Sequence, residues 1–165
     1  TSIGDVSAGA KWLVGQDIAD ANKLAIVGWS YGGYAALQSA VVEPNLYQAV
    51  VAIAPVTDLA LLKEESRGYT NFALVRDFIG SGPHVEQGSP LRNVERIRVP
   101  VLMFHGDKDM NVGIRQSLAM DEALKKAGKQ SELVRFEDLE HSLVGSVART
   151  EMLEKIGAFL AASVE

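Results

Sequence analysis

A serine, an aspartate and a histidine lie at three points of this 165-residue sequence from which they could form a hydrolytic site. The serine, Ser30, is the centre of Gly28-Trp29-Ser30-Tyr31-Gly32, which follows an apolar run and precedes a helical pattern. In that context G-x-S-x-G is typical of a nucleophile elbow, a sharp turn that exposes the serine hydroxyl. Glycines are expected at positions 28 and 32 because a side chain there would collide with the neighbouring strand or helix. The alternative is that Ser30 only caps the following helix, a common role for serine.

A serine hydroxyl needs a base to take its proton, and the sequence contains three histidines. His84 lies in a segment rich in turn-forming residues, where a solvated surface role is expected. His105 ends an apolar run, which favours a buried, hydrogen-bonded structural imidazole. His141 follows the last strand-like segment, at the same sheet edge as Ser30, and is therefore the predicted base.

The loop after His105 offers two candidates for an acid that would orient the histidine, Asp107 and Asp109. The chain order serine, aspartate, histidine matches the α/β-hydrolase arrangement. A second interpretation has His105, Asp107 and Asp109 bind a metal ion. The sequence favours it less, because no second ligand cluster completes a coordination shell and Ser30 would be unexplained. No metal or other cofactor is therefore expected.

Helical and strand patterns alternate along the chain, which is typical of a parallel sheet covered by helices. Four apolar segments are predicted to be strands: residues 23–30, 47–55, 99–106 and 131–138. Helices are predicted after Asp5 and over residues 31–42, 58–80, 114–127 and 150–164, with a loop at 82–90. The first helix is expected to be capped by Asp5 and to turn Val6, Ala10, Leu13, Val14 and Ile18 toward the core.

Composition narrows the class of protein. With 47% hydrophobic residues, residues 1–165 are expected to form one globular unit. The net charge of −5 and the scattered Lys and Arg residues argue against a nucleic-acid partner. There is no cysteine, and no apolar run reaches the roughly 18 residues of a membrane span. A cytoplasmic location is favoured, but the chain starts at Thr1 without Met, so the missing secretory signal indicates little.

Two segments, GWSYGGY and SPLRNVERIRVPVLMFHGDKDMNV, resemble the elbow and the acid segment of the prolyl oligopeptidase family of serine peptidases, which includes dipeptidyl and acylaminoacyl peptidases. The resemblance runs from about Asp5 to the end. It implies the C-terminal part of an α/β-hydrolase catalytic domain, with about four parallel strands. In the family the acid stands four residues after the histidine of the HG pair, which places this role on Asp109. Ser142 departs from the family pattern, which has a glycine after the catalytic histidine.

The same resemblance implies further roles. The backbone N–H of Tyr31 would bind the oxyanion, and the pocket for the cleaved residue would be lined by Tyr31, Val56, Leu59, Leu62 and Val112. The aliphatic side chains of Val56, Leu59 and Leu62 favour substrates with an apolar residue of broad type at the cleavage position. Alternatively, Leu59 and Leu62 are ordinary residues of a helix core. In the family a second oxyanion donor comes from an upstream tyrosine that these residues do not include. The chain alone is therefore expected to hydrolyse activated esters weakly and amides undetectably.

The predicted function is that of a serine peptidase, which hydrolyses peptide bonds of short peptides through an acyl-enzyme with a Ser30, Asp109 and His141 triad. The expected partner is a peptide or small acyl substrate. Two alternatives remain open: an esterase of the dienelactone hydrolase or carboxylesterase kind, and a noncatalytic assembly module. The first predicted strand lacks the neighbour that the full hydrolase sheet would give it. We therefore expect a homodimer or higher oligomer formed through this exposed sheet edge.

Overall fold

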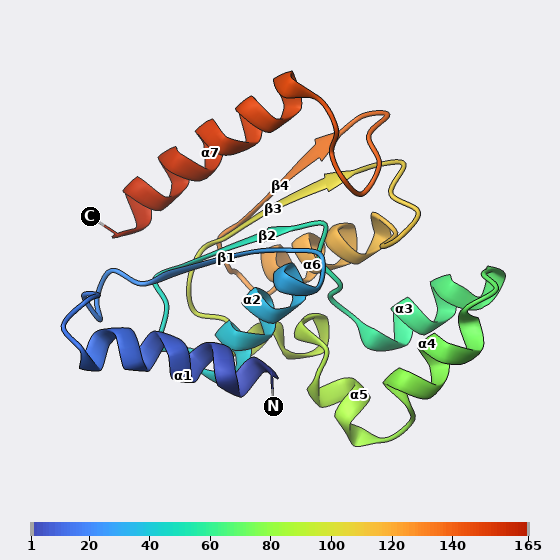
Figure 1. The fold of residues 1–165 in the computed structure, drawn as a ribbon, viewed down its shortest axis with the longest axis horizontal. Coiled ribbons are helices and arrows are strands. Elements are labelled where there is room, and N and C mark those ends of the chain that lie inside the picture. The colour runs from blue at the N-terminus through green and yellow to red at the C-terminus, as the bar shows by residue number, and fades with distance from the viewer. Residues whose placement is uncertain (1, 165) are drawn as a thin grey trace.

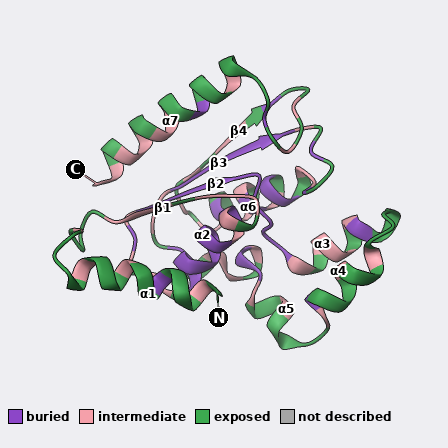
Figure 2. Ribbon diagram, in the orientation of Figure 1, coloured by how far each residue is buried: buried purple, intermediate pink, exposed green. Residues whose placement is uncertain are grey.

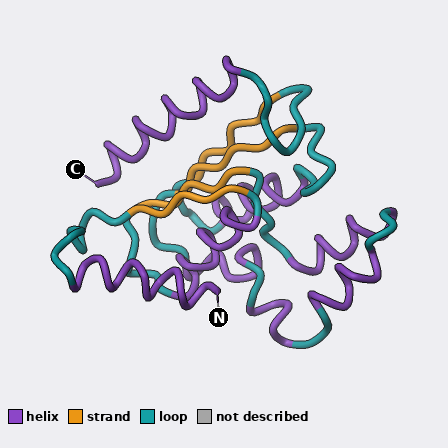
Figure 3. The backbone as a smooth tube through the Cα atoms, in the orientation of Figure 1, coloured by secondary structure: helices purple, strands orange, loops and turns teal. Residues whose placement is uncertain are grey.

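A parallel sheet of four strands forms the centre of the computed structural model, which describes residues 2–164 (Figures 1 and 3). The strands are β1 (Ala25–Trp29), β2 (Ala49–Ile53), β3 (Val101–Gly106) and β4 (Ser131–Phe136). They lie in the order β1-β2-β3-β4, and every neighbouring pair is parallel. This confirms the predicted fold class, and all the predicted strands are present with shorter bounds. Because the strands are parallel, the segments that follow them emerge at one edge of the sheet.

Helices cover both faces of the sheet. Helices α2 (Tyr31–Val42) and α6 (Arg115–Lys126) lie on one face, and α7 (Ser146–Val164) lies on the other (Figure 1). Strand side chains alternate between two hydrophobic clusters: Val50, Ala52, Val101 and Met103 pack with α2 and α6, whereas Val51, Ile53, Leu102 and Phe104 pack with α7. Strands β2 and β3 are buried throughout (Figure 2), which explains their continuous apolar sequences. Within residues 2–164 no helix has the length and apolar character to cross a membrane.

The prediction for the first helix was wrong in its start and in its buried face. Helix α1 (Ser2–Gly15) begins before Asp5, so Asp5 lies in its first turn and does not cap it. Val6, Leu13 and Ile18 are exposed, and Ser7 is buried instead. The physical reason is that α1 packs against α2 rather than against the sheet, so most of its apolar side chains remain open.

An irregular helical region connects β2 to β3 and projects beyond the strand ends (Figure 1). It contains α3 (Leu59–Glu65), η1 (Ser66–Gly68), α4 (Phe72–Ile79), α5 (Pro83–Gln87) and η2 (Pro90–Arg96). The loop predicted for 82–90 was wrong, because Pro83 at the first turn has a backbone torsion suited to starting α5. Helix α7 also starts at Ser146, four residues before its predicted start at Thr150.

Asp58 anchors this region beside the sheet. Its Oδ1 accepts the backbone N–H groups of Ala60 and Leu61 at 2.8 and 3.1 Å, which caps α3. Its other oxygen accepts from Arg92 Nε at 2.7 Å, in η2. The Asp58 side chain is 2% exposed, so the cap and the ion pair together satisfy a buried carboxylate. Helix α3 is thereby fixed close to the strand ends.

Candidate active site

Ser30 lies in a strained turn between β1 and α2. Its backbone has φ 57° and ψ −117°, a combination that residues with a side chain rarely adopt. The turn is held by hydrogen bonds from Ser30 N–H to the Ile53 carbonyl at 2.7 Å and from Tyr34 N–H to the Ser30 carbonyl at 3.0 Å. Ser30 occupies the N-cap position of α2, but its hydroxyl makes no capping hydrogen bond. The hydroxyl is therefore left for another partner.

Close packing of the backbone explains one of the two glycines in the G-x-S-x-G motif around Ser30. A Cβ atom at Gly28 would lie 2.0 Å from the Gly32 carbonyl oxygen, so only glycine fits there. A Cβ atom at Gly32 would meet nothing within 4 Å, so the collision expected at that position was wrong. The crowded neighbour is Gly33, where a Cβ atom would lie 3.0 Å from Pro55 Cβ.

Two hydrogen bonds connect the predicted serine, histidine and aspartate. His141 Nε2 lies 2.9 Å from Ser30 Oγ, and His141 Nδ1 lies 2.6 Å from Asp109 Oδ2. The three residues follow β1, β4 and β3 respectively, so they meet at the carboxyl edge of the sheet. Trp29 Nε1–H donates to the His141 carbonyl oxygen at 3.2 Å, which ties the histidine loop to the elbow. In this arrangement His141 can accept the Ser30 proton while Asp109 accepts the other ring hydrogen.

Asp109 is held as a carboxylate by several donors. Its side chain is fully buried, and burial alone would raise its pKa. Hydrogen bonds from His105, from the backbone N–H groups of Val112 and Asn111, and from His141 outweigh burial and lower the pKa of Asp109 to about 2. Both backbone bonds go to Oδ1 at 2.9 Å, leaving Oδ2 toward the imidazole rings.

The lowered pKa of Asp109 predicts how stability depends on pH. The ordinary value is 3.8, so the ionised group stabilises the fold above about pH 4, and this contribution is lost as pH falls through about 2. We expect Asp109 to contribute about 2 kcal/mol at neutral pH. Urea unfolding from pH 2 to 6 would measure it as the difference between wild type and Asp109→Asn. That difference should shrink toward low pH, and a pH-independent difference would contradict the assignment.

His105 and Asp107, which the metal-binding interpretation grouped with Asp109, take different positions in the structure. His105 is buried, with Nδ1 2.7 Å from Ser117 Oγ and Nε2 2.9 Å from the Val112 carbonyl oxygen, as its strand position predicts. Asp107 Oδ1 accepts the Asp138 N–H at 2.8 Å. Within the described part of the chain, no group of three or more His, Cys, Asp or Glu side chains is placed to hold a metal ion.

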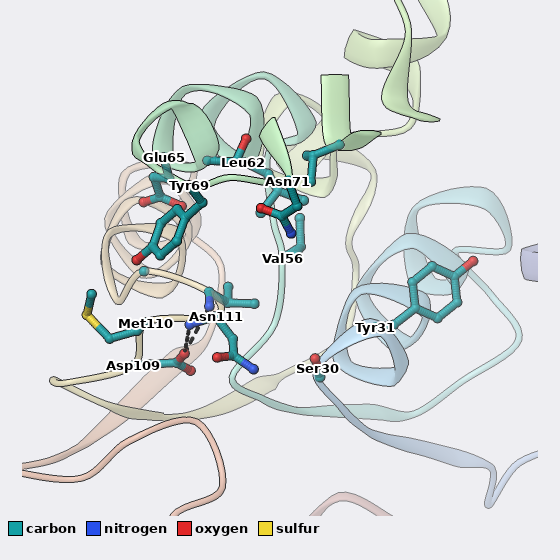
Figure 4. A pocket seen from close by; sticks show the side chains of 14 residues that line it. Ser30, Tyr31, Val56, Leu62, Glu65, Tyr69, Asn71, Asp109, Met110 and Asn111 are labelled. Atoms are coloured by element: carbon teal, nitrogen blue, oxygen red, sulfur yellow. Dashed lines mark hydrogen bonds between the residues drawn. The ribbon is translucent and has the colours of Figure 1, made fainter. Parts of the chain in front are cut away.

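A pocket of about 760 Å³ opens beside Ser30 (Figure 4). Ser30 and Tyr31 lie on one side, and residues of α3, η1 and α4 lie on the other. The segment after β3 lines the third side, where Asp109 and Asn111 are joined by a hydrogen bond. The lining residues are Ser30, Tyr31, Val56, Leu62, Glu65, Ser66, Tyr69, Asn71, Val75, Asp109, Met110, Asn111, Val112 and Gly113.

The pocket contains most of the residues expected in it. Tyr31, Val56, Leu62 and Val112 line it, but Leu59 does not. Leu59 is the first residue of α3, its N–H donates to Ser89 Oγ at 3.0 Å, and its side chain packs beside Gly88. Sequence reasoning missed the residues from η1 and α4, for which the irregular pattern of 58–80 gives no signal. Asn111 could have been found, because it adjoins Val112 in the acid segment.

Tyr31 is placed where its backbone could bind an anion. It is the first residue of α2, so its N–H has no carbonyl partner within the helix. The positive end of the α2 dipole also lies beside Ser30, so the dipole and the Tyr31 N–H would both attract a negative charge there. The Tyr31 side chain is turned outward, with its hydroxyl 2.7 Å from Ser2 Oγ in α1.

The parallel sheet with helices on both faces, and a serine on the turn after its first strand, defines an α/β-hydrolase. The chain belongs to the prolyl oligopeptidase family of serine peptidases, whose sequence model matches residues 1–165. It is 30% identical over 127 residues to an uncharacterized peptidase, YuxL, of Bacillus subtilis, covering 75% of this chain and 19% of that one. It is 26% identical over 142 residues to bovine (Bos taurus) dipeptidyl peptidase 4, covering 86% and 18% respectively.

Solved structures agree with this assignment. The chain superimposes on a puromycin-hydrolyzing peptidase of Mycobacterium tuberculosis with a TM-score of 0.88 and 29% identity, over 98% of this chain and 25% of that one. The chain thus spans about a fifth of the length of the two curated relatives above and a quarter of the solved one.

Proposed function

We propose that the protein is a serine peptidase that cleaves short peptides through an acyl-enzyme, with Ser30 as nucleophile, His141 as base and Asp109 as the orienting acid. The observation that carries the proposal is the continuous hydrogen-bonded connection from Ser30 through His141 to Asp109. The strained backbone of Ser30 supports it, since such strain is concentrated at functional sites. Membership of a peptidase family supports the choice of reaction.

The mechanism follows from these positions. Ser30 Oγ forms a bond to the carbonyl carbon while its proton passes to His141 Nε2. The Tyr31 N–H donates to the oxyanion. His141 then gives the proton to the leaving nitrogen as the C–N bond breaks, leaving the acyl group on Ser30. Water attacks this ester with His141 again as base, which releases the acid and restores the serine. Asp109 holds the imidazole in the required tautomer and stabilises its charged form.

A fluorophosphonate probe tests the nucleophile, and paired substrates test the reaction. The probe should modify Ser30, which mass spectrometry of the labelled peptide would identify. An esterase would hydrolyse acyl esters and leave peptide anilides intact, whereas the proposed peptidase cleaves both. Both substrates would be offered to the 165-residue chain and to a longer protein that contains it; the longer protein decides between the two, because the chain alone is expected to leave amides intact. Failure of the probe to label Ser30 in either protein would favour the noncatalytic assembly role.

We propose that the pocket accepts an apolar side chain of broad type, because Val56, Leu62 and Val112 line it. Leu62→Ala is expected to lower kcat/KM for a leucyl anilide or ester by about tenfold, since it removes apolar contact in a substrate pocket. Leu59→Ala is the matched control: it lies outside the pocket and should change kcat/KM by less than about twofold, although it removes packing beside Gly88. Equal losses in the two variants would contradict this pocket assignment.

We also propose that two copies associate through β1. Among the described strands β1 pairs only with β2, so its other edge presents unpaired backbone groups, and Val27 is 49% exposed. Light scattering at micromolar concentration should give a dimer or larger oligomer. Val27→Lys should give a monomer, because charged side chains oppose edge pairing. A monomeric wild-type chain would contradict the proposal.

A further inference from the structure

Asp109 lies between two serine–histidine pairs. On one side, Oδ2 is 2.6 Å from His141 Nδ1, whose other nitrogen meets Ser30. On the other side, the same Oδ2 is 3.2 Å from His105 Nε2, whose other nitrogen lies 2.7 Å from Ser117 Oγ. In the first pair Ser30 lines the pocket and His141 lines a smaller hollow, whereas His105 and Ser117 are both fully buried. One carboxylate oxygen therefore contacts two imidazole rings.

The surroundings of His105 fix which ring nitrogen carries hydrogen toward Asp109. His105 Nε2 faces two acceptors, the Val112 carbonyl oxygen at 2.9 Å and Asp109 Oδ2 at 3.2 Å. Neither acceptor can donate, so Nε2 must be protonated and shares its hydrogen between them. Ser117 Oγ holds the opposite nitrogen and prevents the ring from turning over. Helix α6, which carries Ser117, is thereby linked to the acid of the site.

We propose that His105 is a positioning residue that, fixed by Ser117, holds Asp109 in place and moderates how strongly Asp109 attracts the proton on His141. The proposal rests on the proposed roles of Ser30, His141 and Asp109. The N–H of His105 takes up part of the hydrogen-bonding capacity of Oδ2. Without it, Oδ2 would interact more strongly with His141 and favour the charged imidazole, which cannot act as a base.

Other charged groups face these rings from neighbouring elements. Glu65 in α3 lies near enough to His105 to interact with it electrostatically; burial raises the pKa of Glu65 above its ordinary value, against the hydrogen bond from Gln116 and the charge of nearby Arg115. On the solvent side, Glu140 lies beside His141 in a hollow of about 270 Å³. Three other charged residues, in the loops after β3 and β4, interact with one another. Asp107 accepts the Asp138 N–H, and Lys108 pairs with the Asp138 carboxylate. These groups are unchanged in the variants below.

The rate of fluorophosphonate labelling of Ser30, measured from pH 5 to 9, tests the proposal without a known substrate. In His105→Leu we expect the labelling rate at the high-pH plateau to fall by about ten- to a hundredfold, by analogy with the loss of a hydrogen-bond partner that orients a metal-ligating histidine. We also expect the pH of half-maximal rate to rise by about one unit. A rate loss with an unchanged midpoint would mean that His105 is only structural, and would overturn the proposal.

Ser117→Ala keeps the buried imidazole of His105, so it tests the proposed positioning role if His105→Leu does not fold. It should move the midpoint in the same direction by a smaller amount, because the ring is no longer fixed. An unchanged midpoint in a folded Ser117→Ala protein overturns the proposal as well. His84→Gln is the control histidine; its ring bonds the Ile79 carbonyl, it lies outside the pocket, and it should leave both rate and midpoint unchanged.

Nuclear magnetic resonance of the imidazole nitrogens separates this inference from the proposed function. His105 Nε2 should carry a slowly exchanging proton in wild type and in Ser30→Ala, whether or not the chain is active. The proton between His141 Nδ1 and Asp109 should change its chemical shift in Ser117→Ala. An unprotonated His105 Nε2 would overturn the inference, whereas normal nitrogen signals with no labelling of wild type at any pH would overturn only the proposed function.

Discussion

Replacing Ser30 by alanine, in a longer protein that contains this chain, is expected to lower hydrolysis by on the order of 10⁶-fold. The reason is that Ser30 Oγ is the atom that would form the covalent bond, and it lies 2.9 Å from the nitrogen that would take its proton. Turnover of an activated ester measures the effect most sensitively. Fluorophosphonate labelling should disappear together with turnover.

Ser163→Ala is the matched control for this substitution. Ser163 lies in α7, where its hydroxyl donates to the Phe159 carbonyl at 2.7 Å, and it is not among the residues that line the pocket. It should leave the rate within about twofold of wild type. Turnover that survives Ser30→Ala would show that another group performs the reaction.

Asp109→Asn is expected to lower kcat by about 10⁴-fold with little change in KM. An amide can donate to His141 Nδ1 instead of accepting from it, which would turn the imidazole into the wrong tautomer for taking the Ser30 proton. The loss should persist across the pH range in which wild type is active. Steady-state kinetics with an activated ester would measure it.

Asp107→Asn is the control that separates the two candidate acids. Its carboxylate accepts the Asp138 N–H and belongs to an exposed turn, so its loss should change kcat by less than about threefold. If Asp107→Asn were the more damaging substitution, the acid would have to be reassigned.

The elements nearest the proposed chemistry were the most predictable from sequence. Strands β2 and β3 are buried on both faces, so their apolar runs leave little room for another interpretation. Ser30, Asp109 and His141 each follow a strand of the same parallel sheet, and such segments share one edge. The juxtaposition of these residues was therefore predictable once the sheet was identified. The tautomer of His105 was not, because it depends on Val112 and Ser117 in other segments.

Features that depend on packing between helices could not be predicted in the same way. The buried face of α1 is set by its contact with α2, and its apolar residues are too numerous to mark one face. Leu59 and Leu62 are equally apolar and lie within one turn of α3, yet only Leu62 lines the pocket. Their different positions follow from the contact of Leu59 with Gly88 and Ser89, which sequence periodicity does not encode.

The positive φ of Ser30 lowers the stability of the fold at the same residue whose hydroxyl the proposed reaction needs. Glycine would adopt φ 57° and ψ −117° without a side-chain penalty, whereas a residue like serine loses about 1–3 kcal/mol of stability in such a conformation. A copy of this chain with no use for the hydroxyl would gain stability by exchanging serine for glycine here. In a lineage released from selection for catalysis, mutation would therefore favour loss of the hydroxyl at position 30 on thermodynamic grounds alone. The serine at this turn therefore lowers stability in return for a hydroxyl that glycine lacks.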